Sequence, residues 1–432
     1  MPAFRTITRC QGCGSHSLIE ILKYGDMPLV NNMRSSGVMN KDDLYPMTLV
    51  YCNQCSLVQI KEIVDPALLF KHYLYFTSNS PSFLAHAKKL SDAVVARMPS
   101  SPDALRPSER QILEIASNDG YLLKYFMEKG FPVLGIDPAE NIAQAANERG
   151  IKTLPEFFSS EMGAYLRAQY QPADVVLGLN VLAHMDNIHG VIDGIRTVLK
   201  PSGFAVFEFP YLRRMIEGGE FDTVYHEHLR YYSLTSIRQI LYFHDMVIFD
   251  AEETPFHGGS LRVWVARRGE RYDVEGQDRV GKLADAELDS QVVDPSLCYK
   301  NFAQKATDIA LALRKYVTQQ SARGDVAVYG ASAKGTVLIN FADIGDMLSF
   351  AVDKSPHKQK HDIPGTNIGV FPPSELLVRM PRQTLLTPWN FAKEIISEQK
   401  KYLNRGGAFI IPVPELKVIT KENIHEMSDM PA

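Results

Sequence analysis

Several features that would place this chain in a specialised class of protein are absent or scarce. No uninterrupted apolar run approaches the ~20 residues of a membrane-spanning helix, and the N-terminal segment lacks the apolar core of a secretion signal. The net charge is only −4 at pH 7, so no excess of positive charge favours binding to nucleic acid or to an anionic membrane. We therefore expect a cytoplasmic protein with neither a membrane nor a nucleic acid as its partner.

The remaining composition is that of a folded protein with more than one domain. Hydrophobic residues make up 45% and charged residues 22% of the 432 residues, which is ordinary for a globular chain. A chain of this length exceeds what one hydrophobic core usually holds, which favours two or three domains. The sequence contains no internal repeat and no low-complexity tract.

Cysteine is also scarce, and four of the five cysteines form two C-x-x-C pairs. Disulfides are rare in a reducing compartment, whereas paired C-x-x-C turns suit a tetrahedral Zn²⁺ held by four thiolates. A redox pair is the alternative, but two matching pairs disfavour it. Four sulfur ligands leave no open position, so the zinc would be structural, and the lone Cys298 would be a buried small hydrophobe. The expected ligands are Cys10, Cys13, Cys52 and Cys55.

From residue 111 onward, short apolar runs alternate with helical patterns. QILEIAS, FPVLGID, ADVVLGLN and GFAVFEFP read as strands buried on both faces, with helical patterns between them. This alternation predicts a parallel, doubly wound α/β sheet. A charged, weakly patterned section at 266–293 indicates a boundary, and a long helix at 295–321 and a second α/β series follow it. We therefore expect three domains, at residues 1–72, 73–265 and 266–432.

The first of these strands leads into a turn with the features of a cofactor site. In LEIASNDGYLL, residues 117–120 form the crossover from a strand to a helix, where ligands of doubly wound sheets bind. Acidic side chains there would repel a pyrophosphate, while Asp137, at the end of the second strand, suits a ribose diol. This combination favours S-adenosylmethionine (SAM), and the alternative is a structural turn with a solvated aspartate. The candidate cofactor residues are Glu114, Ala116, Ser117, Asn118, Asp119, Gly120, Asp137, Pro138, Asn180 and Val181.

Further motifs follow this turn in one order along the chain. They are GIDPAENIA, LNVLAHMDN, YHEHLRYYSL, HGGSLRVWV, VYGASAKGTVLINF, VDKSPHKQKHDIPGTNIGV and TPWN. Together with the cysteine pairs, they resemble the SAM-dependent sugar C-methyltransferases of deoxysugar biosynthesis, which act on nucleotide-linked 4-keto sugars. The resemblance covers nearly the whole chain. It implies a zinc-binding N-terminal domain, a class I (Rossmann-like) methyltransferase core and a C-terminal α/β domain that helps to hold the nucleotide sugar.

Methylation of the carbon beside a ketone, at C3 of a 4-keto-deoxysugar, requires a base. The C–H bond there is too weakly acidic for water to deprotonate it at a useful rate, so a side chain must take the proton while the enolate is stabilised. The carbanion would then attack the methyl group of SAM, held in line by the cofactor site. Histidine is substantially neutral at pH 7 and can accept the proton.

The resemblance assigns this chemistry to the YHEHL motif, with His228 as the base. Glu227 would either orient this base or lie on the enolate side, and Tyr225 would direct its hydroxyl at the sugar. In an extended chain His226 and His228 would share a face, although for His226 we favour a hydrogen-bonded structural role. The expected catalytic residues are His228, Glu227, Tyr225, the second candidate base His184, and Tyr75, which would reach the substrate from the N-terminal side.

The remaining motifs supply candidates for holding the nucleotide and the sugar. HGGSLR, with Arg262, suits the close approach of a diphosphate, although Arg262 could equally form a salt bridge. YGASAKG, with Lys334, is neither a Walker motif nor a complete G-x-G-x-x-G, but its backbone N–H groups could cradle phosphates. Trp389 offers a stacking surface, with a place in the core as the alternative. The candidate substrate residues are Tyr75, Ser78, His257, Arg262, Lys334, Asp353, Lys354, Trp389 and Asn390.

Other functions are compatible with parts of the sequence. An O- or N-methyltransferase acting on a related sugar or natural product is the nearest rival. A zinc-ribbon nucleic-acid-binding module is disfavoured by the absence of a basic stripe. A dehydrogenase ranks last, because no acid other than Asp343 and Asp353 follows VYGASAKG at the distance expected for ribose binding. The sequence leaves open which sugar and which nucleotide are bound, and whether the protein is a monomer or a dimer.

Overall fold

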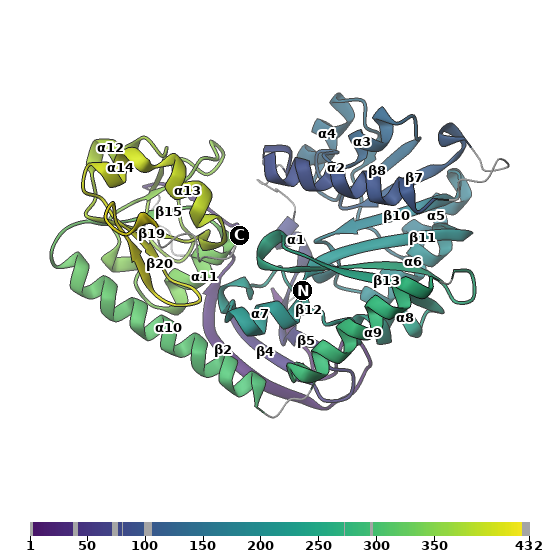
Figure 1. Ribbon diagram of the computed structural model, residues 1–432, viewed down its shortest axis with the longest axis horizontal. Coiled ribbons are helices and arrows are strands. Elements are labelled where there is room, and N and C mark those ends of the chain that lie inside the picture. Colours follow the sequence, from purple (N-terminus) through teal and green to yellow (C-terminus); the bar gives the residue numbers. More distant parts are fainter. Residues whose placement is uncertain are drawn as a thin grey trace.

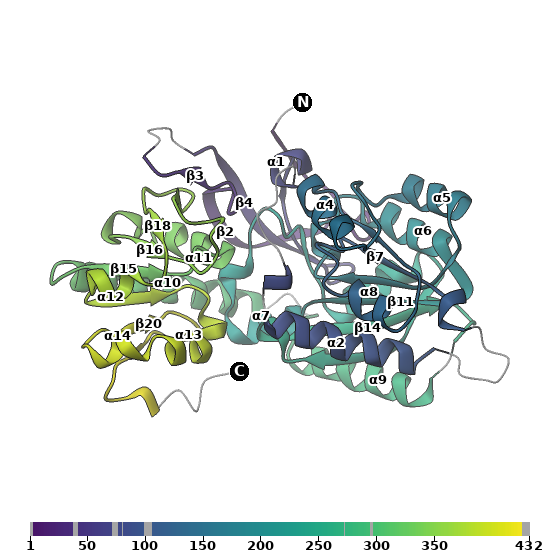
Figure 2. The same cartoon turned by 90° about the horizontal axis from the view of Figure 1, so that it is seen from above.

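The computed structural model consists of two α/β lobes that lie side by side, with the N-terminal strands between and beneath them (Figure 1). Seen from above, the long strands β2 (Leu18–Pro28) and β4 (Leu44–Cys52) run between the lobes (Figure 2). The structure describes residues 3–37, 42–70, 77–79, 81–98, 106–271, 273–293 and 297–425. In this part of the chain, no helix is both long enough and apolar enough to cross a membrane.

The N-terminal unit is a small antiparallel sheet that reaches both lobes. β2 pairs with β4, β4 with β5 (Val58–Ile60), and β5 with β12 (Arg230–Tyr231) of the larger lobe. On the other side, β3 (Arg34–Ser35) pairs with β17 (His361–Asp362) of the smaller lobe. Backbone hydrogen bonds therefore tie the N-terminal unit to both lobes. Its other elements are β1 (Phe4–Thr6), β6 (Glu62–Val64) and α1 (Pro66–Phe70).

The larger lobe is built from seven strands that form one sheet. These are β7 (Gln111–Ile115), β8 (Val133–Ile136), β9 (Thr153–Leu154), β10 (Ala173–Leu179), β11 (Leu199–Pro210), β13 (Met246–Thr254) and β14 (Ser260–Arg267). Their order is β13-β14-β11-β10-β7-β8-β9. β14 is antiparallel to both of its neighbours, and the other pairs are parallel.

Helices cover both faces of this sheet. They are α2 (Pro81–Ala96), α3 (Leu123–Glu128), α4 (Glu140–Glu148), α5 (Ser160–Gln169), α6 (Ile188–Val198), α8 (Leu234–Tyr242) and α9 (Val274–Asp289). The lobe also contains α7 (Leu212–Gly218), whose buried side chains pack in the core shared with the smaller lobe. Its short 3-10 turns are η1 (Thr77–Asn79), η2 (Pro107–Glu109), η3 (Leu182–His184), η4 (Phe221–Thr223) and η5 (Phe256–Gly258). Successive strand residues face opposite cores: Ile112 packs with α2 and α3, and Leu113 with α6 and α8. The predicted doubly wound sheet is confirmed. Its strands are buried on both faces, which explains why they appear in the sequence as nearly continuous apolar runs.

The charged section 266–293, expected as a domain boundary, is mostly helix. α9 packs against β13 and α8 of the larger lobe, and Val280 on its inner face is buried in the core of the seven-stranded sheet. The solvent-exposed face of an amphipathic helix is charged. For this reason α9 has the composition of a linker, although its inner face packs against the larger lobe.

The smaller lobe is a second α/β unit. Its sheet has the order β18 (Val370–Phe371), β16 (Ala351–Val352), β15 (Val326–Tyr329), β19 (Gln383–Leu386), β20 (Phe409–Ile411) and β21 (Lys417–Ile419). All pairs are parallel except that β21 is antiparallel to β20. The helical elements are α10 (Cys298–Ser321), α11 (Ala333–Phe341), η6 (Gly345–Met347), α12 (Glu375–Arg379), η7 (Trp389–Phe391), α13 (Ala392–Glu398) and α14 (Lys400–Asn404).

The two lobes share one local arrangement at the crossover of their first two strands. In the larger lobe, Asp137 follows β8 and accepts the N–H groups of Asn118 and Ala139 at 2.9 and 3.0 Å. In the smaller lobe, Asp353 follows β16 and accepts two backbone N–H groups in the same way, both at 2.8 Å. An acid at this position therefore fixes the turn after the first strand in each sheet.

Candidate active site and metal centre

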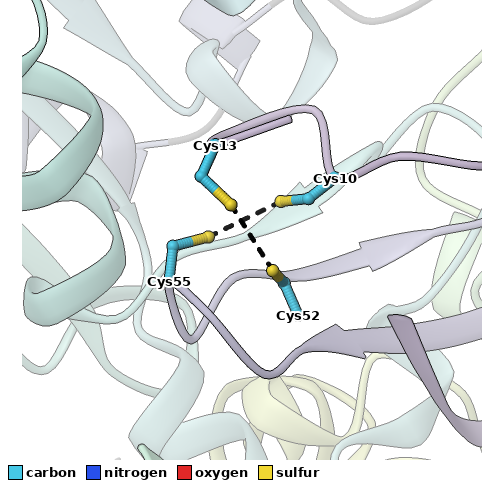
Figure 3. Close-up of side chains that lie close together, drawn as sticks. All are labelled: Cys10, Cys13, Cys52 and Cys55. Carbon is cyan, nitrogen blue, oxygen red and sulfur yellow. Dashed lines mark hydrogen bonds between the residues drawn. The ribbon is translucent and has the colours of Figure 1, made fainter. Parts of the chain in front are cut away.

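The four paired cysteines converge on one point in the N-terminal unit (Figure 3). The Sγ atoms of Cys10 and Cys55 are 3.5 Å apart. Those of Cys13 and Cys52 are 3.6 Å apart, and all four sulfurs lie within 4.8 Å of one another. A tetrahedral zinc ion with Zn–S distances of about 2.3 Å needs sulfur pairs roughly 3.8 Å apart. The four sulfurs therefore fit a structural zinc ion with no open position.

Polar neighbours stabilise the thiolate form of Cys10. Its Sγ atom accepts hydrogen bonds from the Gln59 side chain at 3.2 Å and from the Gly12 N–H at 3.3 Å. The hydrogen bond with the Cys55 thiol, together with these donors, lowers the pKa of Cys10 to about 5. Gln59 is fully buried in β5, so the strand that pairs with β12 also orients a sulfur ligand. Cys298 is half-buried outside the cluster, where its thiol donates to a backbone carbonyl at 3.3 Å.

A cavity of about 420 Å³ lies where the three parts of the protein meet. Asn31 of the N-terminal unit, Tyr225 and His228 of the larger lobe, and Lys334 and Lys358 of the smaller lobe all contribute to its lining. The cavity also borders the turns that follow β7, β8 and β10. Ligands of doubly wound sheets bind outside the carboxyl ends of the strands, and this cavity occupies that place.

The cavity wall contains much of the expected cofactor site. Ala116, Asn118 and Asn180 line it with positive φ angles of 53°, 49° and 54°. Non-glycine residues rarely adopt this conformation, and it clusters at ligand sites. Of the expected cofactor residues, Ala116, Asn118, Asp137, Pro138, Asn180 and Val181 line the cavity, whereas Glu114, Ser117, Asp119 and Gly120 are not part of its lining.

Several buried polar atoms around this turn have no hydrogen-bond partner within the described residues. They are Glu114 Oε2, Ser117 Oγ, Asp119 Oδ1 and Asn180 Oδ1. Such atoms are rare in folded proteins, and Asn180 borders the cavity, so a ligand with N–H or O–H donors would satisfy its oxygen. Burial raises the pKa of Asp137 to about 6, which a nearby cation would lower again. These residues therefore fit SAM, which carries an amino group, a ribose diol and a positive sulfonium.

The 3-10 turn η1 lies directly on the cofactor turn. The N–H of Thr77 donates to Asn118 Oδ1 at 2.9 Å, and the hydroxyl of Ser78 donates to the Asp119 carboxylate. Ser78, expected at the substrate, thus contacts the cofactor turn and is not among the residues that line the cavity. Tyr75, the neighbouring candidate, lies outside the described residues.

The YHEHL motif forms a tight turn and not an extended segment. The N–H of His228 donates to the carbonyl of Tyr225 at 2.9 Å, so the chain reverses between them. Tyr225, Glu227 and His228 line the cavity. His226 is 1% exposed, and its Nε2 lies 3.2 Å from the carbonyl oxygen of Pro46. The period of two holds only in extended chain, so it does not apply to this turn. The contact with Pro46 agrees with the hydrogen-bonded structural role favoured for His226.

The hydrogen bonds of His228 define which ring nitrogen carries the proton. Nδ1 lies 3.1 Å from the carbonyl oxygen of Thr223, and Nε2 lies 2.8 Å from the hydroxyl of Tyr225. A carbonyl oxygen can only accept, so Nδ1 carries the hydrogen and the lone pair of the neutral ring lies on Nε2. The arrangement provides a base whose reactive nitrogen lies beside a hydroxyl.

Two further titratable side chains, Glu227 and His184, line the cavity together with His228. Glu227 is buried and accepts a hydrogen bond from Asn31 at 2.7 Å; burial raises its pKa to about 7, although Asn31 and Lys358 act in the opposite direction. The ring of His184 lies 4.9 Å from that of His228. Burial lowers the pKa of His184 to about 4, so this ring stays neutral at pH 7 and is a weak base.

Lys334 and Trp389 of the smaller lobe are engaged with the larger lobe. Lys334 lines the cavity, and its Nζ lies 3.0 Å from Glu220 and 4.6 Å above the ring of Trp389. Burial would lower the pKa of Lys334, but the carboxylates of Glu220 and Asp222 raise it. Trp389 is 7% exposed and donates through Nε1 to Asp222 at 2.7 Å. It is not part of the cavity lining, so the structure places it in the core rather than as a stacking surface.

The other substrate candidates are distributed unevenly around the cavity. Asn390 lines it, whereas Lys354 is half exposed and pairs with Glu398 at 2.6 Å. Asp353 is bonded to backbone N–H groups and is not part of the lining. Arg262 is buried and, of the two alternatives, forms salt bridges, with Glu208 at 2.7 Å and Glu252 at 3.0 Å. The side chain of His257 lies outside the described part of the structure.

Several residues that line the cavity are absent from the expected set. Asn31 bonds to Glu227, and Lys358 donates to the carbonyl of Ala331 at 2.8 Å. A single Asn in a polar loop carries no recognisable signal, but Lys358 belongs to a conspicuous basic motif. Phe157 also lines the cavity and is 53% exposed, but a single exposed aromatic residue is common on protein surfaces and gives no signal in the sequence.

Comparison with known proteins matches the chain in three consecutive parts. The family models describe a zinc binding domain at residues 10–70, a methyltransferase domain at residues 83–243 and a C-methyltransferase C-terminal domain at residues 255–414. The C-methyltransferase NovU of Streptomyces niveus is 33% identical over 426 residues, which cover 97% of this chain and 98% of NovU. The expected order of a zinc-binding unit, a methyltransferase core and a C-terminal domain is thereby confirmed.

Solved structures resemble the chain only in part. Magnesium protoporphyrin IX methyltransferase of Synechocystis PCC 6803, with bound SAH, is 16% identical and covers 43% of this chain and 83% of its own, with a TM-score of 0.33. The 1,6-didemethyltoxoflavin-N1-methyltransferase of Burkholderia thailandensis is 15% identical and covers 43% and 78%, with a TM-score of 0.31. Similarity of this size does not inform function, and the fold is evident from the strand order itself.

Replacing one sulfur ligand should release the zinc ion. Structural zinc binding is worth about 10–16 kcal/mol in small domains, as much as the total stability of many proteins. Cys52→Ser should therefore lose the metal, about one zinc per chain, and unfold the N-terminal unit, as measured by elemental analysis and by the melting temperature. Cys298→Ser, outside the cluster, should keep both values; a Cys52→Ser protein with its full zinc content would contradict the site.

Removing the charge of Asp137 should weaken SAM binding. Hydrogen bonds to a charged group contribute about 1.5–3 kcal/mol, so Asp137→Asn should raise the dissociation constant of SAM roughly 10- to 100-fold in a calorimetric titration. Asp353→Asn is the matched control, because its carboxylate accepts the same pair of backbone N–H groups but does not line the cavity. Equal losses of SAM affinity in the two variants would show that Asp137 acts only through the fold.

Proposed function

This chain belongs to the C-methyltransferase family, and we propose that it methylates the carbon beside the ketone, C3, of a nucleotide diphosphate-linked 4-keto-deoxysugar. The observation that carries this proposal is a shared cavity, since His228, the cofactor turn and the smaller lobe all line the same space. NovU, a C-methyltransferase, aligns with nearly the whole chain, which supports carbon as the methyl acceptor.

His228 is the group best placed to remove the C3 proton. Its Nδ1–H is held by the carbonyl of Thr223, so Nε2 carries the lone pair. When a sugar enters, the hydroxyl of Tyr225 can rotate from Nε2 to a sugar oxygen, which frees Nε2 to take the proton. The electron pair of the broken C–H bond moves into the enolate, and the proton on Nε2 later passes to solvent.

Glu227 and His184 can stabilise the negative charge on the enolate oxygen. With a pKa raised to about 7 by burial, Glu227 is protonated in a large fraction of molecules at neutral pH, and a carboxylic acid can donate to an oxyanion. The neutral ring of His184 lies beside His228 and offers a second polar contact. Both side chains line the cavity, so the enolate would form among groups that are already in place.

The larger lobe supplies the geometry for methyl transfer. SAM, when bound, provides an electrophilic methyl group. The cofactor turn and the YHEHL turn border one cavity, so the enolate carbon and the cofactor are held together and the reaction becomes effectively unimolecular. The transfer forms the new C–C bond at C3 and leaves S-adenosylhomocysteine.

The smaller lobe offers groups suited to a diphosphate. Ser332, Lys334, Lys358 and Asn390 line the cavity on that side. Ser332 caps α11, whose N-terminal N–H groups carry partial positive charge. Two ammonium groups and a helix N-terminus are a favourable environment for phosphate oxygens. This supports a substrate that places its sugar near His228 and its nucleotide toward the smaller lobe.

Deuterium exchange tests whether an enolate forms at C3. In deuterated water, the enzyme should exchange one hydrogen beside the ketone of a nucleotide-linked 4-keto-6-deoxysugar and add a methyl group on that carbon once SAM is supplied. His228→Gln should lower both rates by about 10²- to 10⁴-fold, as expected for loss of a general base, while SAM affinity is unchanged. Mass spectrometry follows both reactions.

His226→Gln is the matched control for this experiment, because His226 belongs to the same turn but packs against the N-terminal unit. It should exchange and methylate at near wild-type rates. Methylation without exchange at that carbon would favour an oxygen or nitrogen acceptor. Exchange that survives in His228→Gln would remove His228 from its role.

The rate of exchange should fall above pH 7 at saturating substrate. Glu227 is needed as a proton donor, its pKa is raised to about 7, and the protonated fraction falls about tenfold for each pH unit above the pKa. Glu227→Gln, which still donates through its amide, should lose this alkaline limb while keeping measurable activity. An alkaline limb that is unchanged in Glu227→Gln would show that another group titrates.

A further inference from the structure

The short turn η4 is held by all three parts of the protein. The hydroxyl of Tyr24, in β2, donates to the carbonyl of Phe221 at 2.8 Å. Trp389 of the smaller lobe donates through Nε1 to the carboxylate of Asp222 at 2.7 Å. The last residue of η4 is Thr223, whose carbonyl accepts the Nδ1–H of His228. The base is therefore oriented by a turn that is itself fixed from two other units.

Asp222 is a buried carboxylate in the middle of η4, where an ionisable side chain is uncommon. It is fully buried; its Oδ2 accepts the hydrogen bond from Trp389, and its Oδ1 has no hydrogen-bond partner within the described residues. Burial raises its pKa to about 6, with Lys334 acting in the opposite direction. A buried carboxylate that is incompletely bonded costs stability, and such groups are commonly retained for a functional reason.

We propose that Asp222 and Trp389 are positioning residues, and that their hydrogen bond fixes the Thr223 carbonyl and thereby aims the ring of His228. This rests on the proposed function, in which His228 is the base. Residues on either side of Trp389, namely Pro388, Asn390 and Phe391, line the cavity. A ligand that contacts these residues would therefore touch the segment that carries Trp389, which holds η4 through Asp222.

The alignment matters because proton transfer depends steeply on geometry. The base must come within hydrogen-bond reach of the proton that it removes, and a displacement of about 1 Å can cost roughly 100-fold in rate. Asp222 and Thr223 are adjacent in the three-residue turn η4. A displacement of Asp222 would therefore move the Thr223 carbonyl by a similar distance. The smaller lobe thus contributes to proton removal although Trp389 itself does not line the cavity.

Trp389→Phe is the central test, since it removes the N–H donor and keeps an aromatic ring beneath Lys334. With the nucleotide-linked 4-keto-6-deoxysugar that wild type exchanges fastest, kcat for deuterium exchange should fall roughly 10- to 100-fold. KM and the dissociation constant of SAM should stay within about twofold, because the cavity lining is intact. Asp222→Asn keeps an oxygen that accepts the Trp389 N–H, so it should retain most of the wild-type kcat.

A second readout separates positioning from a general loss of structure. In protein labelled with nitrogen-15 at histidine, the ring signals that disappear in His228→Gln identify His228. Wild type should show the Nδ1–H tautomer, and Trp389→Phe should show a mixture of tautomers, because the Thr223 carbonyl no longer lies in register with Nδ1. Asp222→Asn, which keeps the acceptor for Trp389, should show the same signals as wild type.

Two results would overturn the inference. One is a Trp389→Phe enzyme with wild-type kcat; the other is a slower enzyme whose His228 signals match wild type. If wild type itself exchanges no hydrogen, the proposed function fails, but the His228 signals in the two variants still decide whether Asp222 and Trp389 orient the ring.

Discussion

The proposed chemistry depends on one hydrogen bond, from His228 Nδ1 to the carbonyl of Thr223, which fixes the tautomer of a histidine that lines the cavity. A carbonyl cannot donate, so this bond leaves the lone pair on Nε2, beside the hydroxyl of Tyr225. The tight turn between Tyr225 and His228 makes both contacts possible, since it brings two residues three positions apart onto the same side. A longer or extended loop would separate the ring from its two partners.

The N-terminal unit connects the metal site to the cavity through hydrogen bonds, although the metal itself has no open position for a ligand. Gln59 bonds to a zinc-ligating sulfur and lies in β5, which pairs with β12 immediately after the YHEHL turn. The N–H of Ile60 donates to the carbonyl of Leu229, the residue next to His228. Zinc thus stabilises the small sheet against which one end of the turn is fastened, while Asn31 from the same unit bonds to Glu227. In the proposed reaction, the metal would therefore act by stabilising the sheet next to the YHEHL turn, since four sulfur ligands leave no position for a substrate.

The two lobes use similar local structure for different purposes. Asp137 and Asp353 each accept two backbone N–H groups at the crossover after the first strand. Asp137 borders the cavity, whereas Asp353 does not. Two residues of the smaller lobe, Lys334 and Trp389, pair with acids of the segment before the YHEHL turn. One ion pair and one hydrogen bond therefore join the lobes beside the cavity.

Features that depend on neighbouring residues or on periodicity could be predicted from the amino-acid sequence. Paired C-x-x-C turns predicted four converging sulfurs, apolar runs predicted the doubly wound sheet, and the turn before Asp137 predicted the cofactor edge. The partners of Lys334 and Trp389 could be found in the folded structure alone, because Glu220 and Asp222 lie 114 and 167 positions away in the chain. The folded structure also turned His226 away from His228. These contacts depend on which surfaces of the folded lobes pack together, and a local sequence pattern contains no information about that packing.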